Sequence, residues 1–172
     1  MRALLALLLM LPIAAGAQLF GGEERDGGRA RPAETQVTLP QFPTEESYLP
    51  FEAGASAAFD FFVDAKSISV GADRVVRYTV IAKSKGGAVN ISFEGMRCAE
   101  REYRVYAFGR ADKTWSEARN SRWEPILGAG RNSQRTALFR DFFCPVSRDV
   151  ASAEEAVRVL KSGGNPQTTS GD

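Results

Sequence analysis

The chain has 172 residues, with 22 basic and 21 acidic side chains, two cysteines and no histidine. Without histidine it cannot form Ser–His or Cys–His nucleophile pairs, histidine zinc sites or histidine general bases. The near balance of charge excludes a general nucleic-acid binder, which needs a large field of one sign. Two cysteines cannot build a four-sulfur metal site, and we expect neither a metal nor a cofactor.

The first seventeen residues have the layout of a secretory signal peptide. Arg2 gives a positive start, residues 3–13 form an almost unbroken apolar run, and residues 15–17 are a small-residue cleavage site. The run is too short to span a bilayer as a permanent helix. No later apolar stretch reaches about 18 residues, and no cysteine follows the run to carry a lipid anchor. We therefore expect cleavage after Ala17, a periplasmic location and no transmembrane anchor in the mature chain.

Residues 18–46 are expected to form a flexible leader followed by an extended, proline-rich arm. Residues 18–38 are rich in Gly, Arg and Glu, and they hold too few large apolar side chains to offset the entropy of ordering them. Prolines spaced among aromatic residues at 39–43 and 48–51 favour an extended course. The arm can pack on its own domain or serve as a partner-recognition motif, and we favour the first.

Short β-branched and aromatic stretches, separated by turn signals, predict a sheet. The expected strands cover residues 59–63, 66–70, 74–82, 88–94 and 102–109, with weaker extended pieces around Trp115 and at 122–126. Val89, Ile91 and Phe93 alternate with polar residues, and this two-residue period favours a hairpin with the preceding strand.

Helical patterns appear only towards the end of the chain. Residues 133–143 have a broad apolar side, and a second helix is expected from a Ser152–Glu155 capping box to a stop at Gly163. Strands followed by helices predict an α+β fold, an antiparallel sheet of about five strands with C-terminal helices packed on one face. We expect a single domain over residues 47–161 and a disordered tail over residues 162–172.

Cys98 follows a predicted strand, and Cys144 ends the predicted aromatic helix. In an exported domain, two cysteines most simply form one structural bridge. The alternative is a redox-active pair, but catalytic dithiols usually lie close together as Cys-x-x-Cys. We therefore expect a Cys98–Cys144 disulfide that pins the last helix to the sheet.

Several segments resemble the cryptic-neisserial-protein-like family, which is found mostly in envelope proteins of Gram-negative bacteria. The resemblance covers roughly residues 40–146 and lies in PF at 50–51, FVD at 62–64, SISVG at 67–71, VVRYTV at 75–80, NISFEGMRC at 90–98, WEPI at 123–126 and FFCP at 142–145. It implies an envelope location and this fold. The chain departs from the lipoprotein pattern of some members because it has no anchor cysteine. No active site transfers with the resemblance.

Charge is distributed unevenly along the chain. Residues 18–72 hold nine acidic and four basic side chains, whereas residues 97–140 hold ten basic and five acidic ones. Arginine interleaved with aromatic residues can bind an envelope protein or an anionic envelope polymer. The alternative is intramolecular, with the acidic half facing the basic half and both tryptophans in the core. The candidate binding residues are Arg104, Trp115, Arg119, Arg122, Trp123 and Arg131.

The carboxylates in or beside the strands offer a catalytic alternative. Two of them, brought to within about 5–9 Å, could run glycoside cleavage on an envelope polysaccharide. The first hypothesis is nonetheless a non-enzymatic periplasmic domain that binds or assembles with another envelope component, because such carboxylates are usually solvated or paired with arginine. The carboxylates considered are Asp60, Asp64, Asp73, Glu94 and Glu100, with Glu94 the first to test.

Overall fold

The computed structural model describes residues 33–54, 58–128, 133–145 and 149–164. The signal-peptide prediction and Arg131 lie outside these residues. The elements, in chain order, are η1 (Glu45–Ser47), β1 (Tyr48–Phe51), β2 (Phe59–Val70), β3 (Val75–Ser84), β4 (Val89–Arg97), β5 (Glu102–Gly109), β6 (Trp115–Glu117), β7 (Glu124–Pro125), α1 (Ser133–Ala137), η2 (Leu138–Phe143) and α2 (Ala153–Lys161). No helix in the described ranges is long and apolar enough to cross a bilayer.

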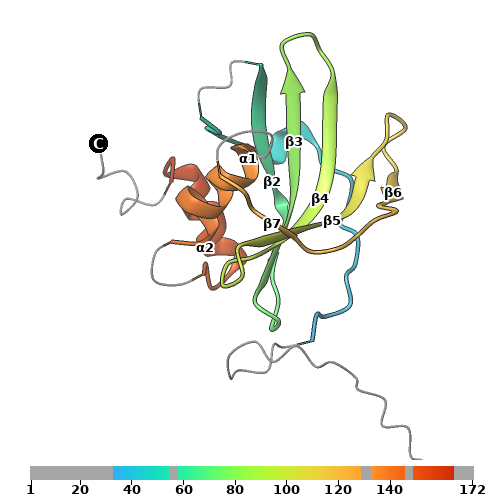
Figure 1. Ribbon diagram of the computed structural model, residues 1–172. Helices are drawn as coiled ribbons and strands as arrows, with labels where there is room; N and C mark the ends of the chain where they lie inside the picture. The colour runs from blue at the N-terminus through green and yellow to red at the C-terminus, as the bar shows by residue number, and fades with distance from the viewer. Residues whose placement is uncertain (1–32, 55–57, 129–132, 146–148, 165–172) are drawn as a thin grey trace, which may run out of the picture. The chain divides into compact units, whose positions relative to one another are not determined.

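The strands form one antiparallel sheet in the order β1-β2-β3-β4-β5-β6, and β7 pairs with β5 beside β6 (Figure 1). The α+β class is confirmed, but the sheet has seven strands rather than about five. The prediction gave residues 48–51 an extended course but did not count them as a strand, and they form β1. A proline is tolerated there because β1 is an edge strand.

The two short strands predicted over residues 59–70 are a single strand, β2. Its register against β3 shifts between Asp64 and Ser69, where the chain bulges. The Ser67 hydroxyl donates to the Asp64 carbonyl at 2.8 Å and accepts from the Thr79 N–H at 2.8 Å. This hydroxyl replaces the missing ladder bond, so the strand continues through the bulge.

The helical part begins with α1 and widens into the π-helical segment η2, where the sequence predicts one regular helix. η2 carries Leu138, Phe142 and Phe143, which are all buried. The capping box of α2 is confirmed, because the Ser152 hydroxyl accepts from the Glu155 N–H at 3.3 Å. Gly163 follows the helix with φ 79°, a conformation that favours glycine.

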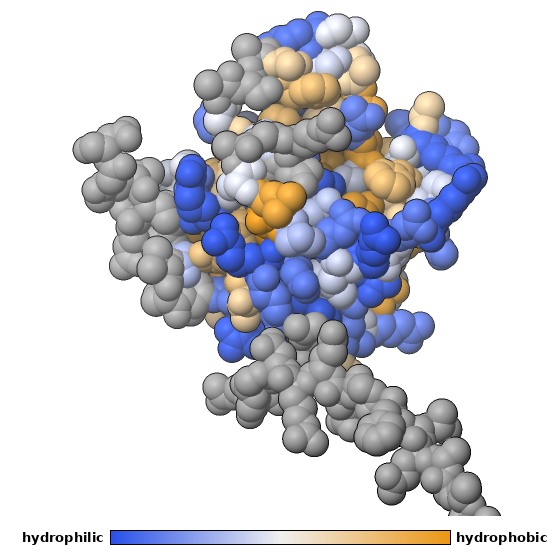
Figure 2. Space-filling view, viewed as in Figure 1, coloured by the Kyte–Doolittle hydropathy of each residue, from blue (hydrophilic) through white to orange (hydrophobic). Residues whose placement is uncertain are grey.

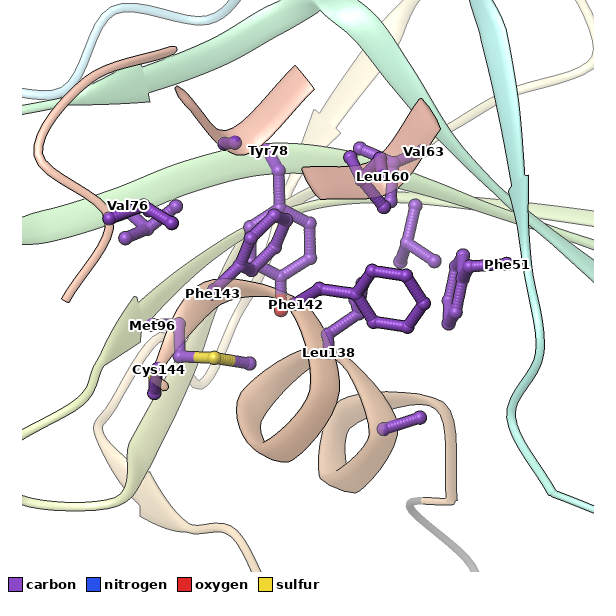
Figure 3. Close-up of a cluster of buried hydrophobic side chains, with 14 of the residues drawn as sticks. Phe51, Val63, Val76, Tyr78, Met96, Leu138, Phe142, Phe143, Cys144 and Leu160 are labelled. Atoms are coloured by element: carbon purple, nitrogen blue, oxygen red, sulfur yellow. The ribbon is translucent and has the colours of Figure 1, made fainter. Parts of the chain in front are cut away.

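The main core lies between the helices and one face of the sheet (Figures 1 and 3). Phe143 packs on Tyr78 with ring centroids 5.0 Å apart, and Phe142 meets Phe51 edge to face at 5.8 Å. The predicted Cys98–Cys144 disulfide is present, with Cα atoms 5.3 Å apart. It joins the end of η2 to the turn after β4.

The opposite face of the sheet has a smaller core made of Phe93, Tyr106 and Ala107. Val37, in the segment of residues 33–44 before η1, packs on it, and this segment, blue in Figure 1, is called the arm below. Trp115 donates through Nε1 to the Pro40 carbonyl at 2.9 Å and packs on Phe42 at 5.3 Å. The arm therefore packs on its own domain, which is the alternative favoured from the sequence.

Candidate functional site

A groove opens on the helix-bearing face, where β2 to β5 extend past the start of α1. It encloses a cavity of about 570 Å³. Figure 2 shows hydrophobic side chains gathered towards the top of this face, over the ends of the strands. The lining residues are Phe59, Phe61, Val80, Ala82, Val89, Asn90, Ile91, Ser92, Glu94, Phe108, Gly109, Ser133, Gln134 and Arg135.

The groove walls include exposed apolar side chains. Among the described residues, five large hydrophobic side chains are exposed, and two of them, Phe59 and Phe108, line this groove on the helix-bearing face. Phe59 and Phe108 are 37% and 50% exposed. A concentration of exposed apolar surface in a concave site is typical of a binding site.

Glu94 forms the buried polar floor of the groove. Its carboxylate accepts two hydrogen bonds from Arg135, through Nε at 2.8 Å and Nη2 at 2.7 Å, and one from the Ser92 hydroxyl at 2.7 Å. Burial alone would lower the pKa of Arg135, but the Glu94 carboxylate raises it above its ordinary value. Burial and the same carboxylate raise the pKa of the Tyr78 hydroxyl, 3.4 Å away. The charge on Glu94 is thus compensated within the fold.

The described part of the chain does not bring two free carboxylates together in this groove. Glu94 is the one acidic residue in its described lining. Asp73 lies with Arg77 on the other face of the sheet, and Asp60 pairs with Lys85 near the β3–β4 turn. No cluster of three or more potential metal ligands occurs among the described residues. In the described lining, apolar side chains therefore surround a single carboxylate whose charge is compensated by Arg135.

A second site, the arginine cluster, lies on the arm-bearing face and consists of Arg77, Arg97 and Arg104 around the carboxylate of Glu34. Arg104 donates to Glu34 through Nη1 at 2.8 Å. Nη2 of Arg77 and Nη2 of Arg97 lie 3.7 and 3.8 Å from the carboxylate oxygens. The three arginines come from β3, β4 and β5, so the sheet itself holds them together.

Two aromatic side chains complete the arginine cluster. The Tyr106 hydroxyl donates to Glu34 at 2.6 Å, and Trp123 Nε1 donates to it at 3.2 Å. The guanidinium of Arg97 stacks on the Trp123 ring at 3.9 Å. Gly95 leaves room for the Tyr106 hydroxyl, because a Cβ at position 95 would lie 2.4 Å from it. Burial, followed by the bond to Glu34, raises the pKa of Tyr106, so the phenol stays a donor.

Asp73 ties the arm to the arginine cluster. Its carboxylate accepts from Arg77 Nη2 at 2.6 Å and from the backbone and hydroxyl of Thr35 at 2.8 and 2.9 Å. Although burial alone would raise the pKa of Asp73, these donors hold it well below its usual range. Glu34 and Thr35 were expected in a flexible leader, but the structure gives both of them partners on the sheet.

The candidate residues taken from the sequence are distributed over different environments. Arg104 and Trp123 meet at Glu34, and Trp115 is covered by the arm. Arg119 is exposed, and exposed Arg122 pairs with Glu124 at 3.2 Å. For Arg104, Trp115 and Trp123, these contacts support the intramolecular alternative. A binding role for the candidate residues stays a prediction.

Sequence reasoning missed Glu34, Arg77, Arg97 and Tyr106 as members of one site. The usable signal was the pairing of the predicted hairpin, because Arg77 lies opposite Gly95, which in turn lies opposite Arg104. The acidic partner could not be found this way, since Glu34 lies 70 residues before Arg104.

Comparison with known proteins identifies the family of this chain. The sequence model of the CNP1-like family matches residues 29–161. The chain belongs to the CNP1-like family. This confirms the resemblance noted in the sequence, and the matched range contains both the groove and the arginine cluster of this CNP1-like protein.

Among curated proteins, this CNP1-like chain is similar to "Cryptic neisserial protein 1" of Neisseria gonorrhoeae (strain ATCC 700825 / FA 1090). The two are 27% identical over an alignment 169 positions long, and the match covers 81% of this chain and 83% of the relative. No solved structure matches the chain significantly.

Proposed function

We propose that this CNP1-like protein is an exported, non-enzymatic binding domain of the periplasm. Its groove holds an apolar segment of another envelope protein. The observation that carries the proposal is the exposure of Phe59 and Phe108 within one cavity.

The dimensions and lining of the groove support this proposal. A cavity of about 570 Å³ lies within the range of roughly 300–1,000 Å³ typical of ligand sites. Binding of a partner removes the apolar walls of the groove from water, which lowers the free energy of the complex. Asn90, Ser92 and Gln134 add polar groups that can orient a bound segment.

A non-enzymatic role is supported by the chemistry that the chain contains. Histidine is absent from the sequence. The Glu94 carboxylate, which would be the first catalytic candidate, is held by Arg135 and Ser92. Polysaccharide hydrolysis needs a second carboxylate beside it, and the described lining offers none.

Export is supported by the pattern of residues 1–17 and by the disulfide. A bridge between Cys98 and Cys144 persists most readily in an oxidising compartment. The partner expected there is an envelope component.

The groove is tested by placing a photo-crosslinking amino acid at Asn90, an exposed lining residue, in cells that export the full chain. We expect a discrete adduct with an envelope protein, and we expect F108D to abolish it while the circular dichroism spectrum is unchanged. Leu39, an exposed apolar residue of the arm, is the matched position outside the groove. The proposal is wrong if Asn90 yields no adduct, or if Leu39 yields the same adduct.

A further inference from the structure

We infer that the arginine cluster is a binding site for an external carboxylate, and that Glu34 is a tethered carboxylate that occupies it. The site lies on the face of the sheet opposite the groove, so it goes beyond the binding role proposed above. Its expected ligands are small molecules or polymers that carry carboxylates, such as sugar acids.

The arginine cluster has more donor capacity than Glu34 uses. Arg104, Tyr106 and Trp123 reach the carboxylate at hydrogen-bonding distances of 2.6–3.2 Å. Arg97 Nη2 lies 3.8 Å from Glu34, which is too long for a hydrogen bond, and Arg77 Nη2, 3.7 Å away, donates to Asp73 instead. In addition, the buried Nε of Arg77 has no hydrogen-bond partner. A ligand with more oxygens than one carboxylate could satisfy these donors.

The donors are also held in place before any ligand arrives. Arg97 is fixed by its stacking on Trp123 at 3.9 Å, and Arg77 is fixed by Asp73. Rigid donors lose little conformational entropy on binding, so more of the interaction free energy contributes to the affinity for a carboxylate.

Glu34 is held in a way that lets an external carboxylate take its place. It precedes β1, the first strand of the sheet, so no strand pairing fixes its backbone. Its neighbour Thr35 is held through the Asp73 carboxylate. An external carboxylate can therefore replace Glu34 while the sheet stays intact. The tether competes at an effective concentration of about millimolar, which weakens binding to the wild-type chain.

The test compares the oxidised wild-type chain with E34Q by isothermal titration with citrate and glucuronate. Glutamine keeps the shape of Glu34 and removes its charge. We expect E34Q to bind these carboxylates at least about tenfold more tightly than the wild type, and we expect E34Q/R104A to lose this binding. E45Q is the matched control, because Glu45 is an exposed residue that pairs with Lys83 away from the cluster. Phosphate at the same concentrations reports whether the site discriminates between oxyanions.

A second measurement needs no variant. In the wild-type chain, excess citrate should increase amide hydrogen exchange at Thr35, because its N–H bond to Asp73 is released with the arm. The inference is overturned if E34Q and the wild type bind citrate equally, or if neither binds it. Unchanged exchange at Thr35 under citrate would also contradict it, and it would leave Glu34 as a structural ion-pair partner. None of these outcomes bears on crosslinking in the groove.

Discussion

At the scale of single residues, Asp73 connects stability to pH. Its side chain is fully buried and pairs with Arg77. It also holds Thr35 of the arm through two hydrogen bonds. Removing one partner of such a buried pair usually costs about 3–5 kcal/mol, because the other charge stays buried without compensation. Asp73 therefore contributes to both the sheet and the seating of the arm.

We expect D73N to lower the free energy of unfolding by about 3 kcal/mol at pH 7. The pKa of Asp73 is lower in the folded chain than the ordinary value of 3.8. Its contribution is therefore complete above that value and is lost as the pH falls towards the folded pKa. The difference between the wild type and D73N should shrink progressively from pH 5 to pH 2. Urea unfolding across this range measures it.

D112N is the control for this experiment. The pKa of Asp112 is also lowered, by hydrogen bonds from Thr114, but Asp112 is exposed. Its removal should change stability little at any pH. A gap between D73N and the wild type that stays constant down to pH 2 would contradict the assignment of the effect to Asp73 ionisation.

The Glu94–Arg135 pair is a second buried ion pair, on the helix-bearing face of the sheet. Glu94 is fully buried and Arg135 is 14% exposed, so the pair is largely shielded from water. The guanidinium also packs over the Tyr103 ring at 4.0 Å. These contacts attach the first turn of α1 to β4 and β5. The pair therefore shapes the groove floor rather than supplying a free acid or base.

At the scale of elements, the segment from η2 to Cys144 is the main link between the helices and the sheet. Phe143 fills the space against Tyr78, and the Phe143 carbonyl accepts from the Val150 N–H at 3.0 Å. The disulfide follows directly, at the point where η2 ends. Packing and covalent linkage therefore act on the same few residues.

We expect the double variant C98A/C144A to fold but to lose about 4 kcal/mol of unfolding free energy, because the bridge closes a loop with a sequence separation of 46 residues. Chemical denaturation of the oxidised wild type and the variant measures the loss. The reduced wild type should unfold near the variant. Equal midpoints for all three samples would show that the bridge adds no stability.

Local patterns in the sequence predicted part of the elements. The alternation of Val89, Ile91 and Phe93 identified the β3–β4 hairpin, because that pattern depends on neighbouring residues alone. By contrast, β1 became a strand only through pairing with β2, which overrides the bias of Pro50. The π-helical geometry of η2 likewise depends on packing against the sheet, which residues 133–143 do not encode locally.

In the candidate sites, too, neighbouring residues in the sequence indicated some members, while tertiary packing determined the others. Arginine and tryptophan enrichment pointed to Arg104 and Trp123, but it could not show that Glu34 meets them. The groove depends on where α1 starts relative to the strand ends, and this is a property of the assembled fold. Residues such as Phe59 and Phe108 match ordinary strand positions in the sequence.

At the scale of the whole domain, the two faces of the sheet are covered differently. Helices and an aromatic core cover one face and leave the groove open beyond α1. The arm covers the other face through a small core and the bonds of Glu34 and Thr35. The uneven charge along the chain is thus partly resolved internally, because an acidic residue of the arm neutralises arginines of the sheet.

Export should be visible in the mature chain itself. We expect protein recovered from the periplasm to have an intact mass that corresponds to a start at Gln18, because the pattern of residues 1–17 predicts cleavage after Ala17. Its unreduced mass should also lack two hydrogens because of the Cys98–Cys144 bridge. A chain lacking residues 2–17 is the control, and it should stay in the cytoplasm with both thiols reduced. Full-length protein with free thiols in the wild-type sample would refute the proposed location.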